Sequence, residues 1–336
     1  METRIGQFDN DTAKPSSKFK TIAIFLGRLI VGVVVLYFVL RLVSLDKIAL
    51  ALRSASIPYV IVGASLLVIN IGSRVMKWHY MLHIIKEESS WWESFTSIML
   101  GITLGSFTPA QLGELGGRSM RITHSKSSHV VGLTLVDRTQ VFWVVAMTGS
   151  FSYAFFFTDN KLLAIILGTA CAGISLYLYF RMDLVKRVAD KINLKILRHQ
   201  WIDGIIESFT FIGRDHFLST LMYSLAFFAI IVLQMYFILN AFVPVSIWAV
   251  FLGFSAMMFF KALLNISISD IGIREASTIY FFALLGVPDA AALSASVVMF
   301  TINIIIPSLI GILFLPKFRK TASIEPRPVS TRDIPQ

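Results

Sequence analysis

Long apolar stretches dominate this sequence and constrain its fold more than any other feature. They occupy residues 21–42, 57–75, 130–157, 161–180, 217–241 and 290–315. A helix that crosses a bilayer needs about 20 predominantly apolar residues, and these stretches have that length. Of the 336 residues, 56% are hydrophobic and only 15% are charged, a composition typical of membrane proteins. The sequence therefore predicts an all-α polytopic membrane protein.

Two polar breaks interrupt the apolar sequence. The first break, residues 105–121, is rich in glycine and carries Glu114 and Arg118, which are four residues apart and would share one face of a helix. The second break is residues 265–275, with the charged residues Asp270, Arg274 and Glu275. Irregular backbone at membrane depth is tolerated only against protein or a wet cavity, and paired broken segments indicate a transporter site.

Basic residues predict the orientation of the chain. They cluster within residues 14–20, 74–86, 181–214 and 317–320, at the ends of apolar stretches. Cytoplasmic loops are enriched in Lys and Arg, so we expect both termini on the cytoplasmic side of the cytoplasmic membrane. The net charge of +10 then reflects topology and anionic lipid headgroups rather than a nucleic-acid partner.

This orientation makes each broken segment a hairpin that enters and leaves on one side. The segment around residues 91–126 begins and ends inside, and that around residues 245–286 begins and ends outside. We therefore expect about six full transmembrane helices plus two oppositely oriented re-entrant hairpins that meet near the midplane. If both segments crossed fully instead, there would be eight spans, and the basic residues after the first break would face outside.

The resulting order of elements predicts an inverted repeat. We expect a cytoplasmic tail (residues 1–20), a first membrane repeat (21–157), a second repeat of opposite orientation (158–315) and a disordered cytoplasmic tail (316–336). Within the second repeat, the basic connection at residues 181–214 is expected to form a pair of amphipathic helices on the membrane surface.

Charged side chains near the two breaks are the candidate substrate-binding residues. Arginine suits capture of a phosphate, and a carboxylate can balance it or bind an amine. The structural alternative is that Glu114 with Arg118, Asp137 with Arg138, and Arg274 with Glu275 are ion pairs that hold the hairpins. Neighbours on a helix diverge by about 100°, so we expect Arg274 and Glu275 to find partners on the first hairpin. The candidates are Glu114, Arg118, Asp137, Arg138, Asp270, Arg274 and Glu275.

Catalytic and cofactor signals are weak in this sequence. Ser106 and Ser119 have His124 nearby but no acid to orient it, and His79 with His83 lacks further ligands for a metal. There is no nucleotide-binding motif. We therefore expect no catalytic residues, no metal and no cofactor, and a protein that is not an enzyme.

Short motifs at the breaks are similar to those of a known family. Pro109, Gly113, Glu114 and Leu115 match a Pro-x-x-x-Gly-Glu-Leu signature, Asp137-Arg138 matches an acidic-Arg pair, and residues 271–275 match a Gly-Val-Arg-Glu signature. On these residues the chain resembles the transmembrane region of lysylphosphatidylglycerol synthase, from residue 21 to residue 315. The sequence departs from the family pattern at Gly117, where arginine is usual, and at Asp270, where glycine is more frequent.

The resemblance implies a flippase-like membrane protein that moves or binds lipids, here as a standalone member without the soluble synthase domain. Its partner would be a membrane lipid: an anionic or aminoacylated phospholipid, a hopanoid or a polyprenyl-linked lipid. We expect lipid transport through a polar groove between the hairpins. Two alternatives remain open, an accessory or enzymatic subunit acting on a lipid-linked substrate and an ion-coupled solute carrier. Homo-oligomerisation also remains open.

Overall fold

The computed structural model describes residues 55–86, 88–108, 110–123, 125–157, 200–264, 270 and 272–315, with isolated positions at 53 and between 162 and 181. The predicted tails, the span at residues 21–42 and nearly all of that at 161–180 lie outside the described residues. All regular structure in the described part is helical, as the apolar stretches predict. The helices are α3 (Ile57–Ile85), α4 (Trp91–Ser106), α5 (Gly113–Ser119), α6 (Ser127–Phe157), α9 (Gln200–Asn240), α10 (Ile247–Leu263), α11 (Ile273–Ala283), α12 (Asp289–Phe300), the π-helix η2 (Thr301–Ile305) and α13 (Ile306–Ile312).

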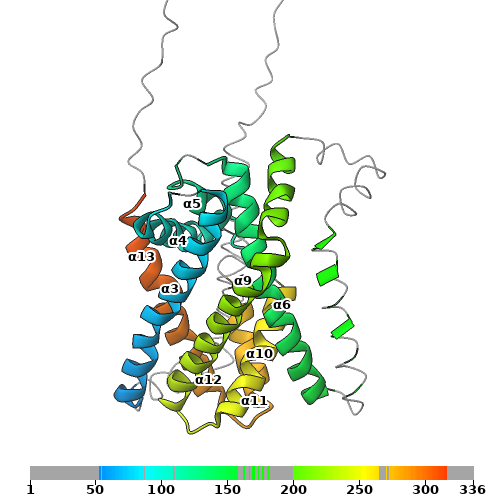
Figure 1. Ribbon diagram of the computed structural model, residues 1–336. Coiled ribbons are helices and arrows are strands. Elements are labelled where there is room, and N and C mark those ends of the chain that lie inside the picture. The colour runs from blue at the N-terminus through cyan, green and yellow to red at the C-terminus, as the bar shows by residue number, and fades with distance from the viewer. Residues whose placement is uncertain are drawn as a thin grey trace, which may run out of the picture.

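Three long helices run the length of the described bundle. Helices α3 and α6 both pack along α9 (Figure 1). Helices α4 and α5 pack against each other at one end, next to α13, whereas α10 and α11 pack together towards the opposite end (Figure 1). We call the α4–α5 pair the first hairpin and the α10–α11 pair the second hairpin. Their positions at opposite ends agree with the opposite orientations expected from the sequence, and their depth in the membrane stays a prediction.

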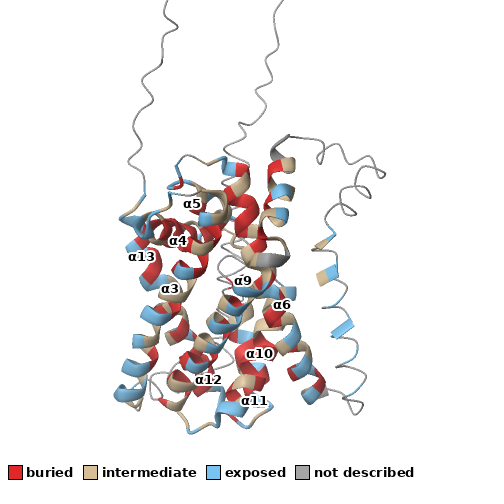
Figure 2. Cartoon of the chain, in the orientation of Figure 1, coloured by how far each residue is buried: buried red, intermediate tan, exposed pale blue. Residues whose placement is uncertain are grey.

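Four described helical segments are long and apolar enough to cross a membrane. They are Ile57–Ile85, Ser127–Phe156, His216–Asn240 and Asp289–Ile312. Their outward faces carry large apolar side chains, as Val68 at 74% exposure illustrates, and exposed residues line the outer faces of the bundle (Figure 2). An apolar face left open to the surroundings suits contact with lipid. The described chain is a polytopic membrane protein.

Two departures from regular α-helix occur in the second half. Gly213 has φ 30° and ψ −166° and kinks α9. The described part of the basic connection, from Gln200, thus continues into a span, and it buries Ser208 and Ile212 instead of lying wholly on the surface. The other departure is η2, which contains Asn303 and is followed by Pro307. Pro307 has no N–H to give to the carbonyl four residues earlier, which favours a departure from regular α-helix at this point.

The interior contains two apolar clusters. One gathers residues of α6, α9, α10, α11 and α12 around Met235, Phe254 and Phe281. The other joins α3, α4 and α6 around Trp78 and Leu133.

Candidate functional site

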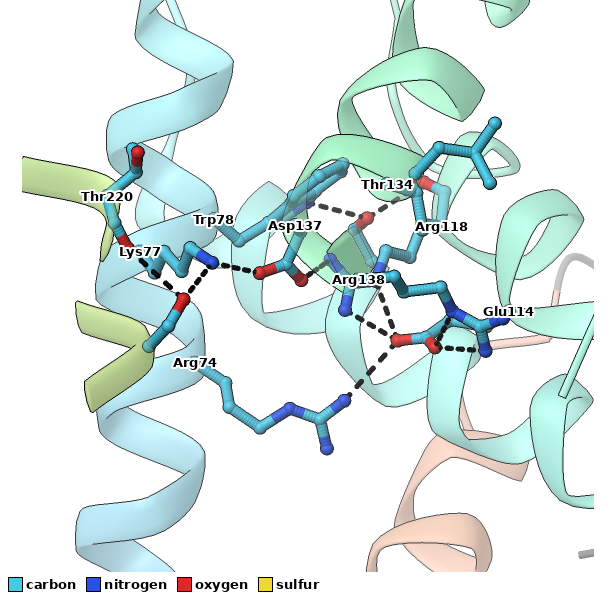
Figure 3. Close-up of polar contacts among 12 residues, drawn as sticks. Arg74, Lys77, Trp78, Glu114, Arg118, Thr134, Asp137, Arg138 and Thr220 are labelled. Atoms are coloured by element: carbon cyan, nitrogen blue, oxygen red, sulfur yellow. Dashed lines mark hydrogen bonds and ion pairs between the residues drawn. The ribbon is translucent and has the colours of Figure 1, made fainter. Parts of the chain in front are cut away.

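Glu114 on α5 is the centre of a buried charged cluster. Its Oε1 accepts hydrogen bonds from Arg118 Nε (3.0 Å) and Nη2 (2.5 Å) and from Arg74 Nη2 (3.3 Å). Its Oε2 accepts from Arg138 Nε (3.0 Å) and Nη2 (2.8 Å). Figure 3 shows the three guanidinium groups converging on this one carboxylate from α3, α5 and α6. The pairing of Glu114 with Arg118 on one helix face is the one expected from their spacing.

Asp137 is the second carboxylate of this cluster. It accepts from Lys77 Nζ at 2.5 Å and from Arg118 Nη1 at 2.8 Å. Lys77 also donates to Ser224 Oγ of α9 at 2.7 Å, and the guanidinium of Arg118 lies 4.6 Å from the ring centre of Trp78 (Figure 3). We call Arg74, Lys77, Glu114, Arg118, Asp137 and Arg138 the first cluster. It holds four cations and two carboxylates.

A smaller charged cluster surrounds the start of α11. Lys261 Nζ contacts Asp270 Oδ2 at 3.0 Å, and the guanidinium of Arg274 pairs with Glu275 Oε1. Glu275 Oε2 also accepts from the Gly272 N–H at 2.7 Å, which satisfies a free donor at the helix N-terminus. We call Lys261, Asp270, Arg274 and Glu275 the second cluster. It is electrically balanced.

The two polar breaks touch each other. Gln111 Nε2 of the first break donates to Asp270 Oδ2 of the second break at 3.3 Å. Ala110, Gln111 and Asp270 all have left-handed backbone, with φ between 51° and 58°. Non-glycine residues seldom adopt this conformation, and it turns the backbone sharply in both breaks. The two breaks therefore touch at these residues, and their meeting as re-entrant hairpins near the membrane midplane stays a prediction.

Both clusters line one cavity of about 390 Å³. The rest of its described wall is largely apolar, with Phe and Met side chains from α6, α9, α10 and α12. Within it, the guanidinium of Arg274 lies 4.1 Å from the ring centre of Phe300, and that of Arg74 lies 5.8 Å from the ring centre of Phe227. The cavity wall therefore combines charged groups with a largely apolar remainder. Its volume lies in the size range of a ligand site.

Most of the residues singled out from the sequence come together here. Glu114, Arg118, Asp137, Arg138, Asp270 and Arg274 all line the cavity, and Glu275 holds the Arg274 side chain. That these residues bind a substrate stays a prediction.

One pairing of the structural alternative is not found, and the expectation for Arg274 and Glu275 is wrong, since the pair named in that alternative forms instead. Asp137 pairs with Lys77 and Arg118 rather than with its neighbour Arg138, because successive residues of α6 point in different directions. Arg274 and Glu275, expected to find partners on the first hairpin, instead pair with each other. Both lie in the first turn of α11, where long side chains can fold back towards the Gly272 backbone.

Arg74, Lys77 and Gln111 belong to the site but were not among its sequence candidates. Arg74 and Lys77 resembled the start of a cytoplasmic loop, whereas α3 continues as far as Ile85 and buries Lys77. The sequence does contain a pattern that indicates their role. Polar residues recur along one face of an otherwise apolar helix, at Asn70, Ser73, Arg74 and Lys77. All four line the cavity.

The other candidate groups have local partners. His79 stacks on Trp91 at 3.9 Å and shares a hydrogen bond with Ser94, and the described residues contain no group of three or more metal-ligating side chains. Ser106 Oγ donates to the Thr103 carbonyl and Ser119 Oγ to the Gly116 carbonyl, while His124 lies outside the described residues.

Comparison with known proteins assigns the chain to a family. Among curated proteins, none matches it at a significant level. The model of the family described as the lysylphosphatidylglycerol synthase TM region matches residues 24–311, which include every described residue of both charged clusters. The chain therefore belongs to the lysylphosphatidylglycerol synthase transmembrane-region family.

Proposed function

We propose that this protein is a lipid flippase of the cytoplasmic membrane and not an enzyme, in which the cavity between the two hairpins carries the polar headgroup. The observation that supports this most is the composition of the cavity wall, which is charged around the two breaks and largely apolar over the rest. A lipid has the same division between headgroup and chains. The family name, which refers to a lipid synthase, agrees with a lipid substrate.

The charged clusters suit a polar headgroup because they supply hydrogen bonds and counter-charges that water would otherwise supply. Moving a charged group through hydrocarbon is strongly unfavourable, so a transporter must supply hydrogen-bond donors and counter-charges along the way. Arg74, Arg138 and Arg274 line the cavity and carry planar sets of N–H donors that match phosphate oxygens.

The contact between the breaks suggests how access could alternate. Among the described residues of the two breaks, one hydrogen bond of 3.3 Å, from Gln111 to Asp270, joins them directly. A single bond of this length is weak enough to break and re-form as the hairpins move relative to each other. In the proposed cycle, opening on one side of this contact admits the headgroup and opening on the other side releases it.

Movement of labelled lipid in proteoliposomes tests this proposal. Vesicles containing the purified protein would carry phosphatidylglycerol, phosphatidylethanolamine or phosphatidic acid labelled on an acyl chain, and a membrane-impermeant reductant would quench the outer-leaflet label. Flipping makes inner-leaflet label accessible, so quenching should exceed that of protein-free vesicles. Arg74→Gln and Arg274→Gln should slow it, whereas Lys126→Gln, at an exposed site outside the cavity, should not.

Quenching equal to that of protein-free vesicles with all three lipids would refute the flippase assignment. Lipids recovered after the assay provide a second readout. Chemical conversion of the lipid would instead place the protein among enzymes that act on lipid-linked substrates.

A further inference from the structure

The cavity carries more positive than negative charge, and this excess defines a class of headgroup. Among the described residues that line it, six are cationic: Arg74, Lys77, Arg118, Arg138, Lys261 and Arg274. Three are carboxylates, Glu114, Asp137 and Asp270, and a fourth, Glu275, pairs with Arg274 from just outside the lining. The excess is two positive charges, and it lies in the first cluster, because the second cluster is balanced.

Sequence outside the described residues offers little to offset this excess from within the membrane. The apolar stretches at residues 21–42 and 161–180 contain no Asp or Glu, and neither do residues 265–269 and 271. The other carboxylates with described partners are engaged elsewhere, Glu93 with Lys86 and Glu207 with His129. Uncompensated cations in a membrane interior are unfavourable, so the site is incomplete without an anion.

The carboxylates of the cavity are all occupied by cations. Glu114 receives three arginines, Asp137 receives Lys77 and Arg118, and Asp270 receives Lys261 and Gln111. Glu275 receives Arg274 and the Gly272 N–H. An amine entering the cavity would have to displace one of these cations and would raise the excess to three charges. A cationic or aminoacylated headgroup is therefore disfavoured.

Arg74 is the cation of the first cluster best placed to bind a ligand. Arg118 and Arg138 each use several N–H groups on carboxylates or carbonyls, and Lys77 is held by Asp137 and Ser224. Arg74 makes one hydrogen bond of 3.3 Å among the described residues, and its side chain is 24% exposed compared with 2% for Arg118. Arg74 lines the cavity, and one of the five N–H donors of its guanidinium has a described hydrogen-bond partner.

Resting on the proposed function, we propose that the cavity selects lipids whose headgroup carries two negative charges on phosphate groups, with Arg74 as a direct phosphate contact. A phosphomonoester, a diphosphate or a pair of phosphodiesters meets this requirement, since a phosphate monoester carries about −1.5 to −2 charges at pH 7. A single phosphodiester balances only one of the two excess positive charges, and a zwitterionic headgroup balances neither.

Binding of defined lipids to the purified, delipidated full-length chain tests this selection. The probes are cardiolipin and phosphatidic acid for two charges, phosphatidylglycerol for one, phosphatidylethanolamine for none and lysyl-phosphatidylglycerol for a cationic headgroup, with affinities measured by native mass spectrometry. We expect cardiolipin and phosphatidic acid to bind at least about tenfold tighter than phosphatidylglycerol, because one additional charge-assisted hydrogen bond provides an affinity gain of this size. Phosphatidylethanolamine or lysyl-phosphatidylglycerol binding as tightly would overturn the proposal.

Two variants test whether the excess charge is the cause. Arg74→Gln removes one cation that has a single described hydrogen bond, and Ser73→Asp adds a carboxylate to the lining without replacing a charged residue. Both should reduce the preference for two charges over one, and Lys126→Gln should retain it. An unchanged preference in both folded variants would overturn the proposal.

Inorganic pyrophosphate separates a lipid from a free anion as the source of the charge. We expect millimolar pyrophosphate to displace cardiolipin poorly, because the apolar wall of the cavity contributes to binding of the lipid. Equal affinity for pyrophosphate would show that the anion alone is recognised. Flipping of labelled phosphatidylethanolamine as fast as that of phosphatidic acid would refute the selection by charge and leave the flippase assignment standing. Selective binding of cardiolipin without flipping of any lipid would refute the flippase assignment and leave the selection by charge standing.

Discussion

Glu114 is the residue on which the first cluster depends. Its carboxylate accepts five hydrogen bonds from three arginines on three helices, and it is 5% exposed. Arg118 is buried beside it and has Asp137 as its other carboxylate partner. Because guanidinium groups this close repel one another, removal of the charge at residue 114 would leave buried cations without compensation.

We predict that Glu114→Gln destabilises the protein strongly while keeping the shape of the side chain. Loss of one partner of a buried ion pair costs about 3–5 kcal/mol, so a large drop in melting temperature is expected in detergent. Arg74→Gln should cost much less, since Arg74 makes one long contact to the same carboxylate. Thermal unfolding of both variants and of Lys126→Gln measures this order, and equal melting temperatures for the first two would contradict it.

At the scale of elements, glycines allow the first hairpin to close. A Cβ at Gly113 would lie 2.1 Å from the Leu104 carbonyl oxygen, and one at Gly117 would lie 2.6 Å from the Leu100 carbonyl oxygen. Helix α5 therefore packs on the backbone of α4 with no room for a side chain. No side chain fits at position 117, and it is Arg118, the next residue, that reaches the carboxylates of Glu114 and Asp137.

We predict that Gly117→Ala disrupts the first hairpin, whereas Gly116→Ala does not. Position 116 has no atom within 4 Å of an added Cβ, so it is a matched control on the same helix. Overpacking at Gly117 should cost about 1–3 kcal/mol, while alanine at 116 should stabilise α5 by up to about 1 kcal/mol. Melting temperatures of the two variants test this difference, and a similar loss in both would show that the close contact at Gly117 does not hold the hairpin.

The elements also show how far the sequence could be interpreted. Hydropathy predicted the described long helices, because a bilayer demands length and apolarity that can be counted along the chain. Hydropathy placed the end of this span at Val75, because Arg74 and Lys77 resembled the start of a loop. Their partners Glu114 and Asp137 lie 40 and 60 residues further along the chain. Pairing across helices depends on tertiary contacts that spacing along one helix does not contain.

At the scale of the whole molecule, the two hairpins lie towards opposite ends of the described bundle (Figure 1). The two breaks touch through Gln111 and Asp270. The cavity lies against this contact, with charged groups from both breaks in its wall. A single cavity lined by both hairpins is what alternating access requires, because a relative movement of the hairpins changes the side to which it opens.

We predict that cross-linking this contact stops lipid movement but retains lipid binding. Gln111→Cys and Asp270→Cys would be introduced together after Cys171→Ser removes the native cysteine, and joined by a short bis-maleimide, whose thioether bonds withstand the reductant of the quenching assay. Quenching in proteoliposomes should fall to the protein-free level. Each single cysteine variant treated in the same way is the control, and undiminished movement in the linked protein would refute the gating role of the contact.

The central claim is that the charged cavity holds a lipid headgroup, and lipids that co-purify with the protein test it most directly. Mass spectrometry would compare the lipids bound to the intact protein, to Arg74→Gln, to Arg274→Gln and to Lys126→Gln with those of the bulk membrane. We predict that one class of lipid with a doubly negative headgroup is enriched in the intact protein and in Lys126→Gln and is lost in the two cavity variants. Lipids that mirror the bulk membrane in all four samples would contradict the claim.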